Sequence, residues 1–282
     1  MSETVDLTSH ISLVTGGANS IGAAVVTRLN SAGATVIVVD LASTEHSAQQ
    51  LIASLPQPAN VHFFSADIAH WAQLRAVFTA VKQRFGKLDF VVACAGTMEH
   101  YPILEDRFDE FGELEESMEA YRTIDVNLNG SLNSMLSTLD QSFHAMQGNH
   151  TKATSTIQAL KLALHHIKSS TTNNKTNPIP PSITLIASTA GYFDGAGTLA
   201  YTASKHGVVG LLRASQSEAR KHGIRVNAIA PFFTTTHMTS GIAQGWVTAG
   251  IEVNSPEAVA KVIVETAVQG EQSGVGVLVS LL

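Results

Sequence analysis

The sequence predicts an α/β protein whose fold is a Rossmann-like, doubly wound sheet of about seven parallel strands flanked by helices. Two observations lead to this prediction. Short runs of β-branched and other apolar residues alternate with longer segments of helical periodicity, and turn residues stand between them. Strands that alternate with helices pair in parallel, because each helix returns the chain to the same edge of the sheet. We find no internal repeat and no interdomain linker, and we expect residues 1–282 to form one domain.

The predicted strands are apolar runs bounded by glycine, proline or polar residues. They cover residues 11–15, 35–40, 61–65, 88–94, 183–187, 225–230 and 275–279. Apolar residues at helical spacing predict helices over residues 21–32, 43–55, 69–85 and 201–222. A last helix begins at Ser255, because serine is a good N-cap and Pro256 suits the first turn.

Composition and charge exclude several classes of protein. A hydrophobic content of 44% supplies a sizeable core, and a net charge of −6 without a long basic run argues against nucleic acid as a partner. No apolar run approaches the ~20 residues that a membrane span needs. The N-terminus lacks the features of a signal peptide, and the single cysteine, Cys94, forms no intrachain disulfide; both features favour the cytoplasm.

We predict no metal site. Residues 98–119 are acidic, and metal binding is the alternative to the simpler interpretation of a solvated loop and helix face. His165 and His166 are adjacent rather than helically spaced, and no cluster of metal ligands stands near them.

A glycine-rich turn follows the first predicted strand. Gly16 and Gly22 stand between that strand and a helix, which is the context that a dinucleotide fingerprint requires. Glycine lets the backbone approach a pyrophosphate, and a helix N-terminus presents free N–H groups to it. The alternative is a tight turn without a ligand.

Asp40 ends the second strand, 18 residues after Gly22. A carboxylate there accepts hydrogen bonds from the adenosine ribose and repels a 2′-phosphate, which favours NAD over NADP. The alternative is an aspartate that caps the next helix.

Tyr201 and Lys205 are four residues apart, so they lie one above the other on a helix. The reference pKa of tyrosine is about 10, and a nearby ammonium group lowers it. The pair therefore suits proton transfer between an alcohol and a carbonyl. Tyrosine and lysine at this spacing also occur on ordinary helices. Two further polar residues belong to the pattern: Ser188, after an apolar run, and Asn127, within residues 125–130.

These stretches together resemble the short-chain dehydrogenase/reductase family, in its single-domain form with a Tyr-x-x-x-Lys site. The resemblance covers about residues 11–279. It implies that Tyr201 exchanges the substrate's hydroxyl proton and that Lys205 holds the nicotinamide ribose and lowers the pKa of Tyr201. It also implies that Ser188 donates a hydrogen bond to the substrate oxygen, and that Asn127 positions a water that relays protons to solvent.

The resemblance implies a set of cofactor-binding residues. In chain order they are Gly16, Asn19, Ser20, Ile21, Gly22, Asp40, Asp67, Ile68, Ala95, Gly96, Tyr201, Lys205, Pro231, Thr234 and Thr236. Asp67 and Ile68 would lie against the adenine, and Thr236 would bind the carboxamide. Three positions depart from the family pattern: Ser20 replaces a glycine, Ala93 replaces an asparagine, and Phe232 follows Pro231 in place of a glycine.

The expected activity is the interconversion of a secondary alcohol and a ketone. Six apolar side chains are expected to wall the substrate pocket, which favours a lipophilic substrate such as a polycyclic alcohol of secondary metabolism: Tyr192, Phe193, Phe232, Phe233, Met238 and Trp246. Half of these could instead be core residues. Residues 232–254 would form a flexible substrate loop. The alternatives are a 3-oxoacyl thioester reductase and a non-redox scaffold that binds a ligand or assists a cyclisation.

Asn127 and Ser188 are 61 residues apart, about 30 more than the resemblance leads us to expect. Residues 161–167 resemble the family's helix before the fifth strand, which puts an insertion near residues 131–156. Leu132, Met135, Leu136 and Leu139 would form an apolar stripe there, buried at a subunit interface or at the substrate mouth. A homo-oligomer, a dimer or tetramer, is expected because the helix from Tyr201 carries more apolar residues than one face needs.

Overall fold

The computed structural model describes residues 5–131, 164, 166–167, 179–193, 197–250, 252–269 and 271–280. Seven strands form one sheet in the order β3-β2-β1-β4-β5-β6-β7, and each neighbouring pair is parallel. The strands are β1 (Ile11–Thr15), β2 (Thr35–Asp40), β3 (Val61–Ser65), β4 (Phe90–Ala93), β5 (Ser182–Ile186), β6 (Arg225–Pro231) and β7 (Gly276–Val279). The prediction of a doubly wound, seven-stranded parallel sheet is confirmed.

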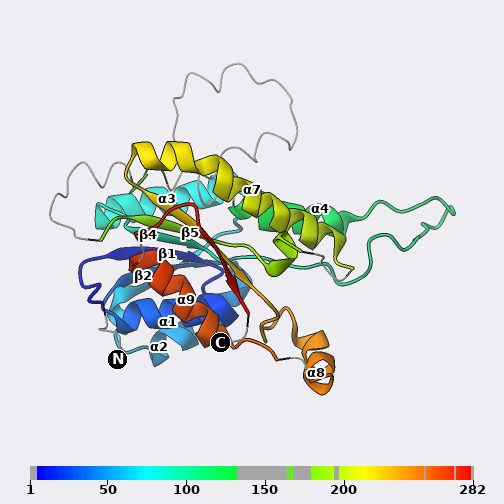
Figure 1. Cartoon of the computed structure of the whole chain (residues 1–282), viewed down its shortest axis with the longest axis horizontal. Helices are drawn as coiled ribbons and strands as arrows, with labels where there is room; N and C mark the ends of the chain where they lie inside the picture. The colour runs from blue at the N-terminus through cyan, green and yellow to red at the C-terminus, as the bar shows by residue number, and fades with distance from the viewer. Residues whose placement is uncertain are drawn as a thin grey trace, which may run out of the picture.

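Helices cover both faces of the sheet (Figure 1). On one face lie α1 (Ser20–Ser31), α2 (Glu45–Ser54) and α9 (Pro256–Val268); on the other lie α3 (Trp71–Phe85), α4 (Met118–Ile124) and α7 (Leu199–Lys221). The strands are apolar on both sides, as a sheet covered twice requires. Two hydrophobic cores result, one between the sheet and each helical layer.

Most differences from the predicted elements are small shifts at their ends. The helix predicted over residues 43–55 divides into a 3₁₀ turn, η1 (Ala42–Thr44), and α2. The strand predicted over residues 88–94 is shorter, because the N–H of Cys94 turns back to the carbonyl of Val92. The substrate loop predicted over residues 232–254 contains a helix of its own, α8 (Ser240–Thr248).

The end of α4 widens into a π-helical turn, η3 (Asp125–Gly130). This turn packs closely on α7, because a methyl group on Gly207 would lie 2.7 Å from a methyl carbon of Leu128. A π-turn shifts the register of the side chains that follow it, and such turns are frequent at functional sites. Here it carries Asn127 into the space between α4 and α7.

The acidic segment forms an arm that extends away from the body of the protein (Figure 1). An isolated bridge between Phe108 and Leu114 closes its tip. Residues 104–116 are exposed, which agrees with the predicted solvated loop. Within the described ranges, no group of three His, Cys, Asp or Glu side chains could hold a metal ion.

The apolar residues that motivated the oligomer prediction are used within the chain. Val208, Val209 and Leu212 are buried in the core beneath α7, and Leu211 packs against it. That argument for an interface was therefore wrong, because these residues cover the sheet rather than an outer face.

Two other predictions fall largely on residues outside the described ones. The insertion near residues 131–156 lies there apart from Ser131, as does most of the segment 161–167. Leu164, His166 and Ile167 are described, and all three are buried. Among the helices of the described ranges, none is long and apolar enough to cross a membrane.

Candidate active site

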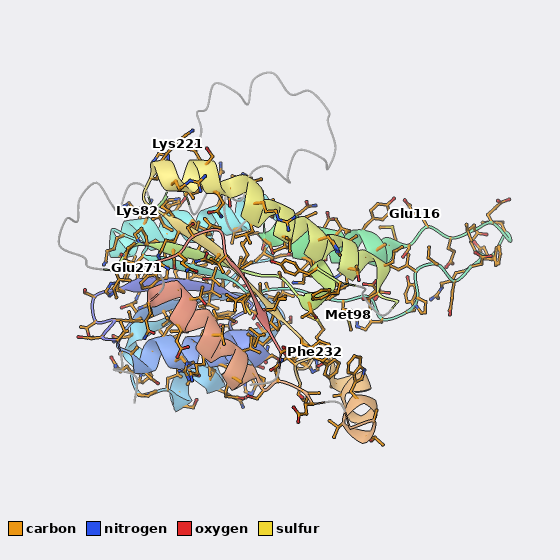
Figure 2. The ribbon with its side chains drawn as sticks, viewed as in Figure 1. Lys82, Met98, Glu116, Lys221, Phe232 and Glu271 are labelled. Atoms are coloured by element: carbon orange, nitrogen blue, oxygen red, sulfur yellow. The ribbon has the colours of Figure 1, made fainter. Side chains whose placement is uncertain are left out.

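A cleft of about 1650 Å³ runs along the carboxyl ends of the strands. It crosses the point where the strand order reverses, between β1 and β4, which is where open α/β sheets bind their ligands. Figure 2 shows Met98 and Phe232 on this side of the molecule, whereas Lys82, Lys221 and Glu271 lie toward the opposite end. Single ligand pockets usually measure roughly 300–1,000 Å³, so this cleft has room for two ligands.

The glycine-rich turn forms one end of the cleft, and it leaves no space for side chains. A methyl group on Gly16 would lie 2.7 Å from the Cα of Ala95, and one on Gly22 would lie 2.0 Å from the carbonyl oxygen of Gly16. Gly16 also has a φ of 65°, in the left-handed region. The turn therefore needs glycine at both positions, and it brings bare backbone and the N-terminus of α1 to the cleft.

Ser20 occupies the position where the resemblance expects the middle glycine. Its φ is 51°, a left-handed conformation that is unfavourable for serine. Its hydroxyl accepts a hydrogen bond from the backbone N–H of His237, at 3.2 Å. The serine therefore ties the glycine-rich turn to the segment before α8, 217 residues further along the chain.

Two aspartates line the cleft beside this turn. The carboxylate of Asp40 accepts hydrogen bonds from the N–H groups of Ala18 and Leu41, at 3.0 and 2.8 Å. Asp67 accepts one from the N–H of Ala69. Each carboxylate has acceptor capacity left, because its two oxygens offer about four lone-pair positions. Asp40 is thus part of the turn and also an acceptor at the cleft wall.

The middle of the cleft brings Ser188, Tyr201 and Lys205 together. Ser188 follows β5, and its hydroxyl is hydrogen-bonded to the phenol of Tyr201. Tyr201 and Lys205 lie one turn apart on α7, with the Lys205 Nζ 5.5 Å from the centroid of the tyrosine ring. The ammonium group also donates to the carbonyl of Ile186, at 2.9 Å. It has three donors, so others remain for a ligand.

The pKa of Tyr201 does not follow the prediction. Burial raises it above its ordinary value, the hydrogen bond to Ser188 opposes that rise, and the charge of Glu99 adds to it. Burial lowers the pKa of Lys205 to about 8. The tyrosine pKa thus moves in the opposite direction from the predicted lowering, because desolvation is its largest cause and the charge of Lys205 is not among its causes. The phenol is protonated at neutral pH.

Cys94 lies beside Lys205 at the end of β4. Burial raises the pKa of its thiol to about 12, although the charge of Lys205 opposes the rise. The residue therefore remains a neutral thiol, in agreement with its interpretation as a small hydrophobic residue.

Asn127 lies behind the cleft wall rather than on it, with none of its surface exposed. Its side-chain oxygen accepts from the N–H of Thr97, and its amide donates to the carbonyl of Thr97 and to the hydroxyl of Ser204. Both N–H groups are thus used within the protein. The expected water relay gains no support from these contacts, which instead hold the loop after β4 against α7.

All fifteen residues predicted to bind the cofactor line the cleft. Gly96 also leaves little room for a side chain in the cleft wall. An added methyl group there would lie 3.2 Å from the side-chain oxygen of Asn127 and 3.7 Å from the Lys205 Nζ. Thr236 exchanges hydrogen bonds with Thr239 at the start of α8. A glycine-rich turn, two acidic acceptors and a lysine in one groove fit a dinucleotide.

The other end of the cleft is aromatic. Trp246 of α8 stacks on Phe233 with ring centroids 4.6 Å apart, and Phe232 meets the same indole edge-on at 5.8 Å. These rings and Met238 line the cleft. Phe193 does not line it: that side chain is 61% exposed. The placement of Phe193 in the pocket was therefore wrong.

Tyr192 does not line the cleft either. Its ring packs against the core beneath α7, and its hydroxyl lies 2.1 Å from the position that a methyl group on Gly276 would take. The 3₁₀ turn η5 (Thr189–Gly191), whose Gly191 packs directly on the backbone of Lys205, directs this ring toward β7.

Among the cleft residues that were not predicted, two make contacts with predicted site residues. Glu99 lies in the loop after β4, and His237 precedes α8. Neither belongs to a recognisable motif. Their partners, Tyr201 and Ser20, are about a hundred or more positions away, so no local pattern marks them.

The fold and the cleft define an α/β dinucleotide-binding protein with a serine, a tyrosine and a lysine at the centre of its site. The family model described as short chain dehydrogenase matches residues 10–158 and 149–246. The chain therefore belongs to the short-chain dehydrogenase/reductase family of oxidoreductases, whose members use NAD or NADP.

Individual proteins are similar to the chain over most of its length. A short-chain dehydrogenase/reductase named prx4, from Penicillium roqueforti, is 30% identical over 93% of this chain and 66% of its own length, so the chain spans about two thirds of that relative. Zerumbone synthase of Zingiber zerumbet is 25% identical over 83% of this chain and 72% of its own length. The crystal structure of a 3-ketoacyl-(acyl-carrier-protein) reductase from Brucella melitensis, complexed with NADH, has a TM-score of 0.74. It is 20% identical and covers 97% of this chain and 98% of its own, which shows the shared fold.

Proposed function

We propose that the protein is an NAD-dependent oxidoreductase that interconverts a secondary alcohol and a ketone on a lipophilic substrate. The observation that carries this proposal is the hydrogen bond between Ser188 and Tyr201 in the middle of the cleft, with Lys205 one turn further along α7. This group lines the same cleft as the glycine-rich turn and the aromatic side chains, so one cleft offers contacts to both ligands that the proposal requires.

In the proposed reaction, Tyr201 exchanges the hydroxyl proton of the substrate. A bound nicotinamide supplies the acceptor or donor of the hydride. In the direction of oxidation the phenolate of Tyr201 takes the hydroxyl proton while the carbon–hydrogen bond of the carbinol breaks. In the direction of reduction the phenol donates its proton to the carbonyl oxygen. Ser188 donates a hydrogen bond to that oxygen, where negative charge develops.

The remaining proposed roles follow from position. Gly16, Gly22 and the N-terminus of α1 would receive the pyrophosphate, and Lys205 would hold the nicotinamide ribose with its remaining donors. Asn127 becomes a positioning residue, because it fixes Thr97 and Ser204 on either side of the site.

Asp40 supports the choice of NAD. Its carboxylate lines the cleft at the end of β2, next to the turn, and is itself held by Ala18. A ribose hydroxyl can donate to such a carboxylate, whereas a 2′-phosphate would meet its negative charge. We therefore infer that the protein prefers NAD.

The aromatic end of the cleft supports a lipophilic substrate. Phe232, Phe233 and Trp246 offer three ring faces or edges, and rings of this kind bind flat apolar molecules by stacking. The similarity to zerumbone synthase agrees with a natural-product alcohol. A cytoplasmic location and a homo-oligomer remain predictions; light scattering at micromolar protein would test the second.

The test is to incubate the protein with NAD and a panel of alcohols while following nicotinamide absorbance. The panel should contain polycyclic and short-chain secondary alcohols, and acetoacetyl thioesters with NADH should test the alternative of a thioester reductase. We expect turnover with the polycyclic alcohols. Tyr201→Phe should lower kcat by ~10²–10⁴-fold and leave NAD binding intact. Wild-type turnover in Tyr201→Phe would overturn the proposed role of Tyr201, whereas no turnover with any of these substrates would favour the non-redox scaffold.

A further inference from the structure

Glu99 is a buried carboxylate that makes contact with the helix of the proposed active site. It lies in the loop after β4 and is 6% exposed. One of its oxygens accepts the N–H of Ala200 at 2.9 Å, and the other accepts the N–H of Tyr201 at 3.0 Å. Both donors belong to the first turn of α7, so the contact reaches the backbone of the tyrosine itself.

The contact replaces a missing helix cap. The first N–H groups of a helix lack partners within it, and a side chain at the N-cap usually accepts one of them. Thr198, the N-cap of α7, makes no such bond. Glu99 supplies two acceptors from about one hundred positions away, and a negative charge is favourable at this end of a helix.

A second contact in the same loop shows that the loop and α7 are held together over several residues. Asn127 binds both backbone groups of Thr97 and donates to Ser204, whose hydroxyl donates to the carbonyl of Tyr201 at 2.6 Å. Tyr201 is thus held at its N–H by Glu99 and at its carbonyl by Ser204. These two bonds hold the backbone of the residue that carries the phenol.

The charged and polar groups that face Tyr201 come from three elements. Lys205 comes from α7 itself, Ser188 from the end of β5, and Glu99 from the loop after β4. Cys94, at the end of β4, interacts electrostatically with Lys205 and with Asp40, at the end of β2, and neither Cys94 nor Asp40 is among the groups that shift the pKa of Tyr201. Glu99 is the group among these whose negative charge raises the pKa of Tyr201.

We propose that Glu99 is a positioning residue for Tyr201, which holds the first turn of α7 in place and keeps the phenol in its proton-donating form. The inference rests on the proposed role of Tyr201 as the proton-transfer group. The proposal gives the loop after β4 a role in holding Tyr201, which is separate from binding the nicotinamide. It also implies that the carboxylate favours reduction over oxidation near neutral pH.

The test compares Glu99→Gln with the wild type in the pH dependence of alcohol oxidation. Oxidation requires the phenolate, so the rate rises with pH until Tyr201 is deprotonated. The glutamine retains one acceptor oxygen and loses the charge. We expect the rising limb of the pH–rate profile to move to lower pH, because the charge that raises the pKa of Tyr201 is gone. Glu99→Asp retains the charge on a shorter side chain. The rising limb of its pH–rate profile should therefore stay in place while kcat falls.

Glu119→Gln is the matched control. The carboxylate of Glu119 accepts the backbone N–H of His100, next to Glu99, and its charge is not among the causes that shift the pKa of Tyr201. General loosening of the loop would therefore also change the activity of this variant. The rising limb of its pH–rate profile should not move. An unchanged limb in Glu99→Gln, or an equal shift in Glu99→Asp, would overturn the inference.

A titration without substrate separates this inference from the proposed function. The phenol absorbance of Tyr201 is the difference between each protein and its Tyr201→Phe partner, and its midpoint should fall in Glu99→Gln. If Tyr201→Phe turns over normally but the midpoint still falls, the proposed proton-transfer role of Tyr201 fails and the action of Glu99 on the phenol stands. If Tyr201→Phe is inactive and the midpoint does not fall, the inference about Glu99 fails alone.

Discussion

At the nucleotide end of the cleft, a methyl group on Gly22 would lie 2.0 Å from the carbonyl oxygen of Gly16. At the substrate end, no described atom outside the helix backbone lies within 4 Å of such a group on Gly241 or Gly245. One end is packed backbone against backbone, and the other is a short helix that carries aromatic side chains. The difference predicts that cofactor binding depends on the absence of side chains, whereas substrate binding depends on their presence.

The largest effect should come from Gly22→Ala. The added methyl group would overlap the backbone of the turn, which cannot yield without displacing the start of α1. We expect NAD binding to be lost and unfolding stability to fall by about 1–3 kcal/mol or more. Calorimetric titration with NAD and thermal unfolding would measure both changes.

Gly245→Ala is the matched control at the substrate end. It places alanine in the interior of α8, where alanine favours a helix by roughly 0.5–1 kcal/mol over glycine. We expect unchanged NAD binding and no loss of thermal stability. Equal damage from the two substitutions would remove the contrast between the ends of the cleft.

Trp246→Ala should affect the substrate end alone. It removes the ring that contacts both Phe232 and Phe233, and each aromatic pair contributes about 0.5–1.5 kcal/mol. We expect KM for a polycyclic alcohol to rise by roughly tenfold, which corresponds to about 1.4 kcal/mol. The Kd of NAD, measured in the same preparation, should stay within about twofold of the wild-type value; a larger change would mean that the rings support the nucleotide end as well.

Asp40→Ala should sharpen the comparison at the nucleotide end. Removing the carboxylate removes an acceptor for the ribose hydroxyls and the repulsion of a 2′-phosphate. We expect the ratio of the NADP Kd to the NAD Kd to fall by about tenfold, as one charge-assisted hydrogen bond predicts. Tighter binding of NADP than of NAD by the wild type would show that Asp40 does not contact the ribose and only stabilises the glycine-rich turn, through its hydrogen bond from Ala18.

The smallest effect should come from Ser20→Gly, at the bond that joins the two ends. Glycine relieves the left-handed conformation, which costs serine roughly 1–2 kcal/mol, but it removes the hydroxyl that holds the N–H of His237. We expect slightly tighter NAD binding and a KM for the alcohol that rises a few-fold. Ser20→Ala loses the hydroxyl and keeps the strain, so it should raise KM without improving NAD binding.

The sequence by itself determined what depends on neighbours along the chain. The apolar runs of the seven strands, the glycine-rich turn between Gly16 and Gly22, and the placement of Tyr201 and Lys205 on one helix face are all encoded within a few residues. Periodicity and glycine content report such local geometry directly. Parallel strands joined by helices also place their carboxyl ends at one edge of the sheet, which is where these residues meet, although the order of the strands came from the structure.

The tertiary structure alone decided what depends on burial and on contacts between distant segments. It placed Phe193 in solvent, Asn127 behind the cleft wall and Glu99 against the first turn of α7. It also reversed the expected pKa shift of Tyr201, because the loss of water around the phenol is the largest cause and outweighs the effect of the bond to Ser188. Desolvation depends on every element packed around a group, and no spacing of two residues along a helix contains that information.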